Sequence, residues 1–571
     1  PENILALTFT ESAAANMRKR LIGLIGPAGY YADICTFHGF CHRLIRESPE
    51  NFPKIIGSEN IGPAGQIALI RKIIEATRLR HLKPFGDKFY YVSEILNALK
   101  KLKNEGWSPD YFKKNIASTA AGKTATRQKE LALVYQKYQS ELARQKLYDF
   151  DDMILETLTA LKKNKNFLLD LQEKYQYILV DEHQDTNGAQ NKTLEFLAGY
   201  DNSPNLFVVG DDKQAIFRFQ GASLENFLYF KKKYPAVKLI ELKSNYRSSQ
   251  KILDASQSLI EKNTAALAST ALRSIQKPAG RKIKIASLDS ADAEYLFIAE
   301  KIKELTAQKI PAREIAVIYR ENKDAPPLAD ILERQGINHA VESDENILED
   351  IDIKKLNLLM KAVSDFPKTE RLAPALHLDF LGLDPLEIYK WLESKTKSTA
   401  VLSVIQKIGY WKKLSFNLPF PNFFEAVIKE SGFLKNILSQ PNYSDRARRL
   451  NKLFNEIKKS VRENHDYSLA DYLEYLEMLK EHRLPLATKM TALGDSVRLM
   501  TAHRAKGLEF ETVFITGAYN GHWGNKRKRD ILGLAGLISS PGETDPNEDE
   551  RRLFYMALTR AKKDVYITYS A

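Results

Sequence analysis

The stretch QYILVDEHQDTN, residues 176–187, predicts the fold more sharply than any other part of the chain. It runs from a short apolar segment directly into two adjacent carboxylates, Asp181 and Glu182. At the carboxyl end of a parallel β-strand, side chains open into the crevice where ligands bind. Two acids there can divide the work of phosphoryl transfer, since one can hold a hydrated magnesium ion while the other orients or deprotonates a water. An acid pair that only caps the next helix is the alternative interpretation.

A second apolar run ends in polar residues at NLFVVGDDKQAIFRFQGA, residues 205–222. Gln214 stands where its side chain could touch both a nucleotide phosphate and the adjoining loop. Phe217 and Phe219 alternate with Arg218, so the two rings point the same way if this stretch is extended. Exposed rings beside basic groups can stack on unpaired bases. Burial of both rings in the core is the competing interpretation.

Three further segments carry groups suited to a nucleotide. LKSNYRSSQKIL (242–253) places Tyr246 and Arg247 just before an expected helix. An aromatic ring can stack on adenine, and a guanidinium can pair with phosphate oxygens through two hydrogen bonds. The segments VRLMTAHRAKGLEF (497–510) and ERRLFYMALTRAKK (550–563) add His503, Lys506, Glu509 and Arg560. None of these residues is distinctive by itself.

Apolar runs alternate with helical patterns over much of the chain, which is typical of parallel sheets covered by helices. The expected strands include ILALTFT (4–10), VKLIEL (237–242), KIKIASL (282–288) and IAVIYR (315–320). We therefore predict an α/β fold of two parallel-sheet domains, each interrupted by a mainly helical insertion. The predicted domains are residues 1–46 with 148–241, and 242–364 with 491–571; the predicted insertions are 47–147 and 365–490.

Composition and charge narrow the class of partner. The 571 residues include 44% apolar and 27% charged side chains, which is ordinary for a soluble globular protein. No apolar run approaches the ~18 residues of a membrane helix. The net charge of +13 indicates a polyanionic partner such as nucleic acid, or else a generally basic surface. Two cysteines are too few for a disulfide framework or a zinc site, and they fit a reducing, cytoplasmic compartment.

Taken together and in this order, the segments resemble the superfamily 1 helicases of the UvrD/Rep/PcrA group. Nine blocks between Ile4 and Lys563 carry the resemblance: TFTESAAANMRKRL, TFHGFCHRLIR, YDFDDMIL, VDEHQDTN, GDDKQAIFRFQGA, LKSNYRSSQKIL, IAVIYRENKDAPPLADILERQGI, TAHRAKGLEF and ALTRAKK. The helical insertions match by position and size more than by sequence. The resemblance implies two RecA-like motor domains with ATP and Mg²⁺ in the cleft between them. It also implies single-stranded DNA crossing both motors, and 3′ to 5′ unwinding of duplex DNA in repair or replication.

The resemblance further implies a role for each candidate residue. On the nucleotide side, Asp181 would bind magnesium, Glu182 would be the catalytic base and Gln214 would sense the terminal phosphate. Tyr246 would stack on adenine and Glu509 would contact the ribose. Arg247 and Arg560 would be arginine fingers that reach the terminal phosphate. On the DNA side, the residues that line the single-strand path are Thr8, Phe9, Thr10, His38, Phe217 and Phe219. His503 would link the ATP site to the DNA.

The chain departs from the family pattern at the phosphate-binding loop. The loop G-x-x-x-x-G-K-[ST] is not found, and we expect it upstream of Pro1 in a longer protein. The only G-K-T, residues 122–124, has Ala117 in place of the earlier glycine and lies in the basic insertion, so we predict that it is not this loop. Gln220 stands where members of this group usually have an arginine, which puts one charge-assisted coupling contact of that arginine in doubt.

Two alternatives stay open beside a complete helicase. Lys213 and the sequence KQAIFRF slightly resemble helicase–nucleases of the AddA/RecB kind, so the chain could be the motor portion of such an enzyme. It could also be a DNA-binding fragment without ATPase activity. For residues 1–571 alone, we expect weak binding of single-stranded DNA and no hydrolysis of ATP.

Overall fold

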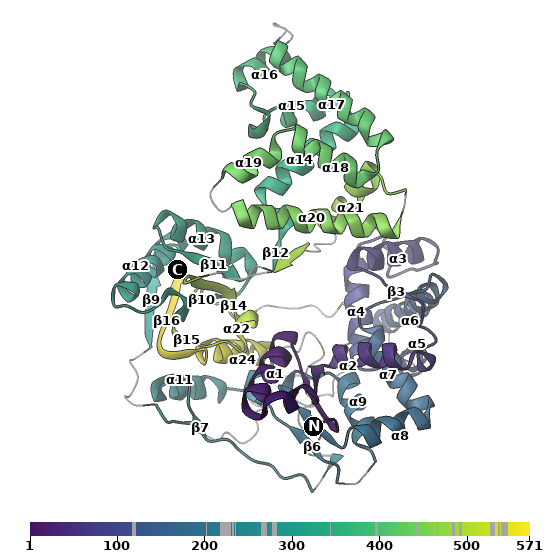
Figure 1. The fold of residues 1–571 in the computed structure, drawn as a ribbon, viewed down its shortest axis with the longest axis vertical. Helices are drawn as coiled ribbons and strands as arrows, with labels where there is room; N and C mark the ends of the chain where they lie inside the picture. The colour runs from purple at the N-terminus through teal and green to yellow at the C-terminus, as the bar shows by residue number, and fades with distance from the viewer. Residues whose placement is uncertain are drawn as a thin grey trace. The chain divides into compact units, whose positions relative to one another are not determined.

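The computed structural model describes residues 1–116, 122–200, 203–216, 230, 233–234, 236–263, 271–276, 283–342, 344–393, 398–440, 443–464, 466–481, 486–489, 494–525, 531–534, 537 and 546–570. The chain divides into two compact units. The first unit combines Pro1–Glu342 with Thr491–Ala571, and the second unit is Ser343–Met490. The first unit contains both large parallel sheets, and the second unit is mainly helical (Figure 1).

The first sheet has four parallel strands in the order β2-β1-β5-β6. Its strands are β1 (Ile4–Thr8), β2 (Asp33–Thr36), β5 (Tyr177–Val180) and β6 (Leu206–Val208). Its helices are α1 (Glu11–Ile25), α2 (Phe37–Glu47), α7 (Asp152–Lys163), α8 (Lys165–Lys174) and α9 (Gly188–Ala198). Leu5 and Leu7 of β1 pack with residues of α2, α7 and α9 into one core on one face of the sheet.

On the opposite face of the first sheet, the described residues cover β1 but leave the side toward β6 more open. Ala6 packs with Ala14 of α1, and its strand register continues from Ala6 to Leu179 and then to Phe207. Residues paired in a parallel register point to the same face. Leu179 and Phe207 nevertheless remain 38% and 57% exposed. The apolar surface of this face therefore grows toward β6, which is also the end strand of the sheet.

One strand predicted after β6 in the chain is wrong. Residues 237–243 form no strand, and Val237, Leu239, Ile240 and Leu242 are all exposed. A β-strand needs a neighbour to satisfy its backbone hydrogen bonds. In the described part of the chain, this apolar segment has no strand to pair with, which explains why the predicted strand does not form.

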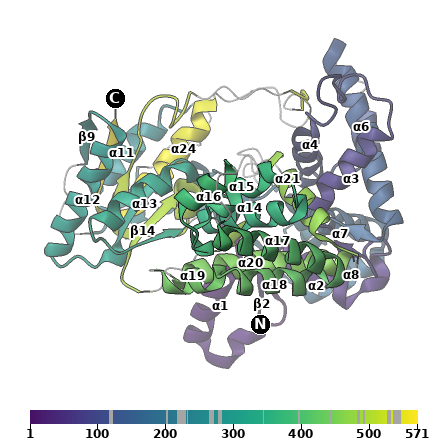
Figure 2. The ribbon, with the colours of Figure 1, turned by 90° about the horizontal axis from the view of Figure 1, so that it is seen from above.

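The insertion into the first sheet is a small helical group that both views place together (Figures 1 and 2). Its elements are β3 (Glu59–Asn60), α3 (Pro63–Glu75), α4 (Val92–Asn104), α5 (Pro109–Ile116), α6 (Gly122–Arg144) and β4 (Leu147–Tyr148). Lys123 and Thr124 lie in the first turn of α6. The described element before α6 is a helix, not the strand that a phosphate-binding loop would follow.

The second sheet has six parallel strands in the order β11-β14-β10-β15-β16-β9. Its strands are β9 (Lys284–Leu288), β10 (Ile315–Tyr319), β11 (His339–Glu342), β14 (Val497–Thr501), β15 (Phe510–Ile515) and β16 (Ala561–Ser570). Figure 1 shows how it joins teal and yellow segments that lie far apart in the chain. Its helices are α11 (Gln250–Ile260), α12 (Ala291–Ala307), α13 (Ala325–Arg334), α22 (Ala502–Ala505) and α24 (Pro546–Leu558).

Helices cover both faces of the second sheet. Val317 and Tyr319 of β10 pack with residues of α12 and α13, whereas Ala316 and Ile318 pack with residues of α11 and α24. All five residues of β10 are buried as a result. A small strand pair, β7 (Ser244–Asn245) with β8 (Arg273–Ser274), precedes this sheet.

The second unit packs around one aromatic core. Its helices are α14 (Ile351–Asp365), α15 (Thr369–Leu376), α16 (Pro385–Leu392), α17 (Thr399–Asn417), α18 (Phe420–Glu430), α19 (Phe433–Ser439), α20 (Tyr443–Glu463) and α21 (Leu469–Glu481). The strands β12 (Asp344–Asn346) and β13 (Ala487–Lys489) pair at its base. Leu356 and Met360 of α14 belong to the same core as Phe423 and Tyr472. The unit thus begins before residue 365, where we expected the insertion to start.

Candidate nucleotide and DNA site

The acid pair predicted from the sequence lies at the carboxyl end of β5. The amide of Asp181 donates to the Leu7 carbonyl at 2.9 Å, and the amide of His183 donates to the Val209 carbonyl at 2.9 Å. These two hydrogen bonds hold the turn after β5 between the neighbouring strands β1 and β6. Glu182 has a positive φ of 53°, a conformation that costs free energy for a residue other than glycine and is often found at functional sites.

The first acid has the character expected of a cation ligand. Burial raises the pKa of Asp181, and the neighbouring charge of Glu182 raises it further. A bound cation would relieve both effects. Mg²⁺ commonly takes one or two protein carboxylates and fills its other positions with phosphate oxygens and water. Among the described residues, no group of three or more His, Cys, Asp or Glu side chains could hold a metal ion.

Gln214 and Arg560 connect the two sheets. Gln214 is the last residue of the short helix η4 (Asp212–Gln214) in the first sheet domain, and Arg560 lies between α24 and β16 of the second. The Arg560 Nη2 donates to Gln214 Oε1 at 3.0 Å, and Gln214 Nε2 donates to Asp211 Oδ2 at 2.7 Å. Arg560 is 2% exposed, and this burial, with repulsion from Arg247, lowers its pKa to about 10. An anion placed beside it would be bound strongly in this dry setting.

Lys506 makes a second connection between the sheets. Its Nζ forms an ion pair with Asp185, lies 3.4 Å from Glu182 Oε2, and donates to the Gln214 carbonyl at 3.1 Å. Burial raises the pKa of Asp185 to about 7, although the Lys506 ammonium opposes this rise. The strand–acid junction of the first sheet is therefore bound to the loop after β14 of the second.

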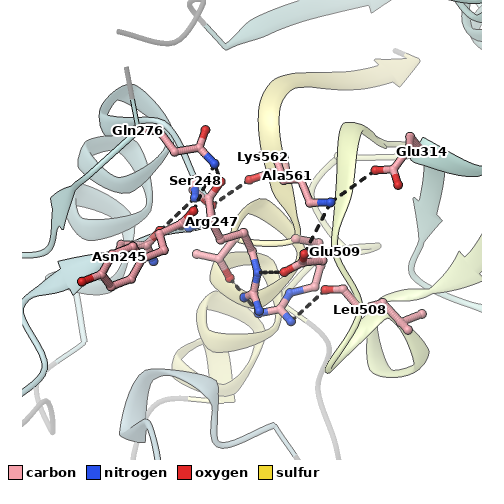
Figure 3. Close-up of polar contacts among 12 residues, drawn as sticks. Asn245, Arg247, Ser248, Gln276, Glu314, Leu508, Glu509, Ala561 and Lys562 are labelled. Atoms are coloured by element: carbon pink, nitrogen blue, oxygen red, sulfur yellow. Dashed lines mark hydrogen bonds and ion pairs between the residues drawn. The ribbon is translucent and has the colours of Figure 1, made fainter. Parts of the chain in front are cut away.

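Arg247 points toward Glu509 in Figure 3, and its Nε donates to Glu509 Oε2 at 2.8 Å. The other oxygen of Glu509 lies 3.4 Å from Lys562 Nζ, which lies 3.3 Å from Glu314 Oε2. The hydrogen bond from Arg247 lowers the pKa of Glu509, with a further contribution from Lys562. Tyr246 is 74% exposed, so its ring face is open to a stacking partner.

A pocket of ≈ 640 Å³ opens where β1 and β2 end. His38 lines it and stacks on Phe150, with ring centroids 4.0 Å apart. Burial and the nearby Lys100 lower the pKa of His38 to about 4, so its ring is neutral at neutral pH. Thr8 Oγ1 and His38 Nε2 are buried without a hydrogen-bond partner among the described residues. The pocket thus offers a ring face, a cation and two unsatisfied polar atoms.

The remaining predicted DNA residues occupy different settings. Phe9 lines the same pocket, whereas Thr10 caps α1, its hydroxyl accepting from the Ala13 amide at 3.1 Å. His503 lies on the short helix α22, directly after β14. Phe217 and Phe219 lie outside the described residues.

Sequence reasoning assigned no role to three residues that the structure places in these sites. Lys506 and Asp185 were quoted within their blocks, but a spacing pattern does not reveal an ion pair across 321 positions. Phe150 could have been found, because it is an aromatic residue inside the quoted block YDFDDMIL.

In the described part of the chain, no helix is both long and apolar enough to cross a membrane.

Comparison with known proteins bears on the whole chain. Residues 1–235 match the UvrD/REP helicase N-terminal domain, and residues 240–366 with 388–571 match the UvrD-like helicase C-terminal domain. A probable DNA helicase II homolog of Rickettsia felis is 30% identical over 600 residues, which cover 100% of this chain and 86% of the relative.

Two further relatives carry the name ATP-dependent DNA helicase PcrA. The protein of Staphylococcus epidermidis is 29% identical over 604 residues, and that of Bacillus subtilis is 28% identical over 593 residues. Both alignments cover 100% of this chain, and they cover 77% and 76% of the respective relatives. The two parallel sheets are accordingly RecA-like motor domains, and this chain belongs to the UvrD-like helicase family.

Proposed function

We propose that the protein is an ATP-driven translocase on single-stranded DNA that unwinds duplex DNA in the 3′ to 5′ direction, in repair or replication. The observation that carries this proposal is the meeting of polar residues from both sheets. Arg560 contacts Gln214, and Lys506 contacts Glu182, so a nucleotide bound there would touch both motor domains. The direction and the cellular role follow from the resemblance to the UvrD/Rep/PcrA group.

Each side chain of the proposed ATP site has a defined task. Asp181 would hold Mg²⁺, which supplies charge neutralisation on the phosphates when it is bound. Glu182 would accept a proton from the attacking water, while Arg560 and Arg247 would reach the terminal phosphate. Arginines in this position contribute about 10³–10⁵ in rate in related phosphoryl transfers. For Arg247 this requires release from Glu509, which would then be available to a ribose hydroxyl.

The phosphate-binding loop itself would come from a strand–loop–helix unit that completes the first sheet. Three features support this proposal: β6 is the end strand of the sheet, Leu179 and Phe207 are exposed on one face, and the apolar segment 237–242 pairs with no strand in the described part of the chain. Parallel sheets are normally covered on both faces. A strand added beside β6, followed by a helix over Phe207, would place a glycine-rich turn at the edge that carries Asp181.

The pocket at the ends of β1 and β2 would bind the single strand. The His38–Phe150 ring pair offers a stacking surface and Lys100 offers a positive charge, which is the combination that binds unpaired nucleotides without sequence preference.

A strand-displacement assay tests the proposal in protein extended upstream of Pro1. Duplexes with a 3′ or a 5′ single-stranded tail are mixed with the protein and ATP. We expect ATP-dependent unwinding of the 3′-tailed duplex only. Unwinding from the 5′ tail alone would contradict the direction, and binding of both duplexes without unwinding or ATP turnover would favour a DNA-binding protein without motor activity.

A further inference from the structure

A single ammonium group connects the DNA pocket with the proposed catalytic base. Asp185 lines the pocket together with Thr8 and His38, although it is only 2% exposed. Its Oδ2 accepts a hydrogen bond from Lys506 Nζ. Lys506 comes from the second sheet domain, is not among the described residues that line the pocket, and lies 3.4 Å from Glu182.

The two carboxylates compete for this ammonium group. Asp185 Oδ1 has no hydrogen-bond partner among the described residues, so its charge depends on Lys506 for compensation. A DNA phosphate brought into the pocket would repel the Asp185 carboxylate in a setting where solvent screens weakly. Compensation of the Asp185 charge by Lys506 reduces that repulsion, so an occupied pocket favours the ion pair with Asp185 and draws the ammonium group away from Glu182.

We propose that Asp185 is a positioning residue that couples occupancy of the DNA pocket to the contact between Lys506 and Glu182. This inference rests on the proposed binding of single-stranded DNA in the pocket. Coupling between two sites is reciprocal, so changes at Lys506 must alter DNA affinity although Lys506 does not line the pocket.

A double-mutant cycle on DNA affinity measures this coupling without any need for ATP hydrolysis. The dissociation constant of a labelled oligothymidylate is measured at low salt by fluorescence anisotropy for the wild type, D185N, K506Q and the double variant. We expect D185N to bind about 5-fold more tightly, because a negative charge beside the DNA is removed. K506Q should bind the oligothymidylate about 5-fold more weakly, because the negative charge of Asp185 then has no ammonium group beside it. In the D185N background, K506Q should weaken DNA binding by less than about twofold.

Asp151 provides a matched control. It lines the same pocket, and its pKa is raised to about 6 by burial and by Asp149, yet Lys506 is not among the charges that act on it. D151N should also tighten DNA binding, but the full effect of K506Q should persist in its presence.

An equal effect of K506Q in the wild-type and D185N backgrounds would overturn the proposal. Weaker DNA binding by D185N together with a lower melting temperature would instead assign Asp185 a structural role. If D185N does not fold, the DNA affinities of K506Q and K506R test the proposal instead. The proposal requires that K506Q binds single-stranded DNA more weakly than the wild type and that K506R binds it equally well. Equal DNA affinities of K506Q and K506R would overturn it. If the wild-type protein binds no single-stranded DNA, that result contradicts both the proposed DNA function and this inference. If it binds DNA but the two substitutions have independent effects, that result contradicts this inference alone.

Discussion

The two parallel sheets differ in how completely they are covered. Every residue of β10 in the second sheet is buried, because helices lie on both faces. In the first sheet, β5 alternates between buried and exposed residues, and β6 has no buried residue. Parallel sheets are usually covered on both faces. Among the described residues, this difference is what we expect if the phosphate-binding loop that we propose comes with a further strand and helix of the first motor domain.

The largest expected effect comes from Glu182, the proposed catalytic base, in the first motor domain extended upstream. Glu182→Gln, made in protein extended upstream, preserves the shape of the side chain but removes its basic group. We expect DNA-stimulated ATP turnover to fall by about 10²–10⁴-fold. Binding of nucleotide and DNA should stay near wild type, as equilibrium titrations can check. Turnover close to that of the wild type would remove Glu182 from the proposed role.

A pair of truncations tests the difference in coverage directly. Ile318 of the second sheet is fully buried, so Ile318→Ala should cost about 2–5 kcal/mol of unfolding free energy. Phe207 of the first sheet is more than half exposed, so Phe207→Ala should change stability by about 0.5 kcal/mol or less in residues 1–571. Denaturant titration gives both values.

The same Phe207→Ala substitution should become costly in the extended protein, because the added helix would bury the ring. A loss that is equally small in both forms of the protein would mean that no helix covers this face.

Much of this architecture could be predicted from the sequence, and the exceptions have physical causes. The strand–acid junction at 176–182 and the strands at 282–288 and 315–320 are confirmed in substance, because a strongly apolar run bounded by polar residues leaves few options. The strand predicted at 237–242 is wrong because strand formation depends on a neighbour, which local composition does not report.

The candidate site shows the same limit. Asp181 and Glu182 could be placed from their position after a strand. The ion pair between Lys506 and Asp185 could not, because it depends on how the two sheet domains face each other within the first unit. Sequence blocks name such residues separately, and only the fold brings them together.

The stacking role proposed for Phe219 predicts an effect of intermediate size. Phe219→Ala should weaken binding of single-stranded DNA by about 1–3 kcal/mol, whereas Phe219→Trp should be tolerated because it keeps a ring face. Anisotropy titrations measure both affinities, with circular dichroism as a control for folding. Unfolding of the alanine variant would show that the ring belongs to the core.

The smallest expected effect is a pH dependence of stability. Burial raises the pKa of Asp185 to about 7, so the folded protein binds a proton between about pH 4 and pH 7 that the unfolded chain has released. The stability contributed by this group therefore decreases as the pH rises through that window. Lys506 and Glu182 are the charged groups that act on it. The melting temperature of D185N should fall less between about pH 5 and pH 8 than that of the wild type, and an equal fall would contradict the assignment.

The most direct test of the account is DNA-stimulated ATP turnover by residues 1–571 and by the protein extended upstream of Pro1. In the proposed site, Asp181, Glu182, Gln214 and Arg560 would surround the terminal phosphate, but without the backbone amides and the lysine of the loop the phosphates would lack most of their direct ligands. The account predicts no turnover by residues 1–571 and clear turnover by the extended protein. Clear turnover by residues 1–571 alone would contradict it, and the loss of that turnover in Lys123→Ala would then assign the phosphate site to the start of α6.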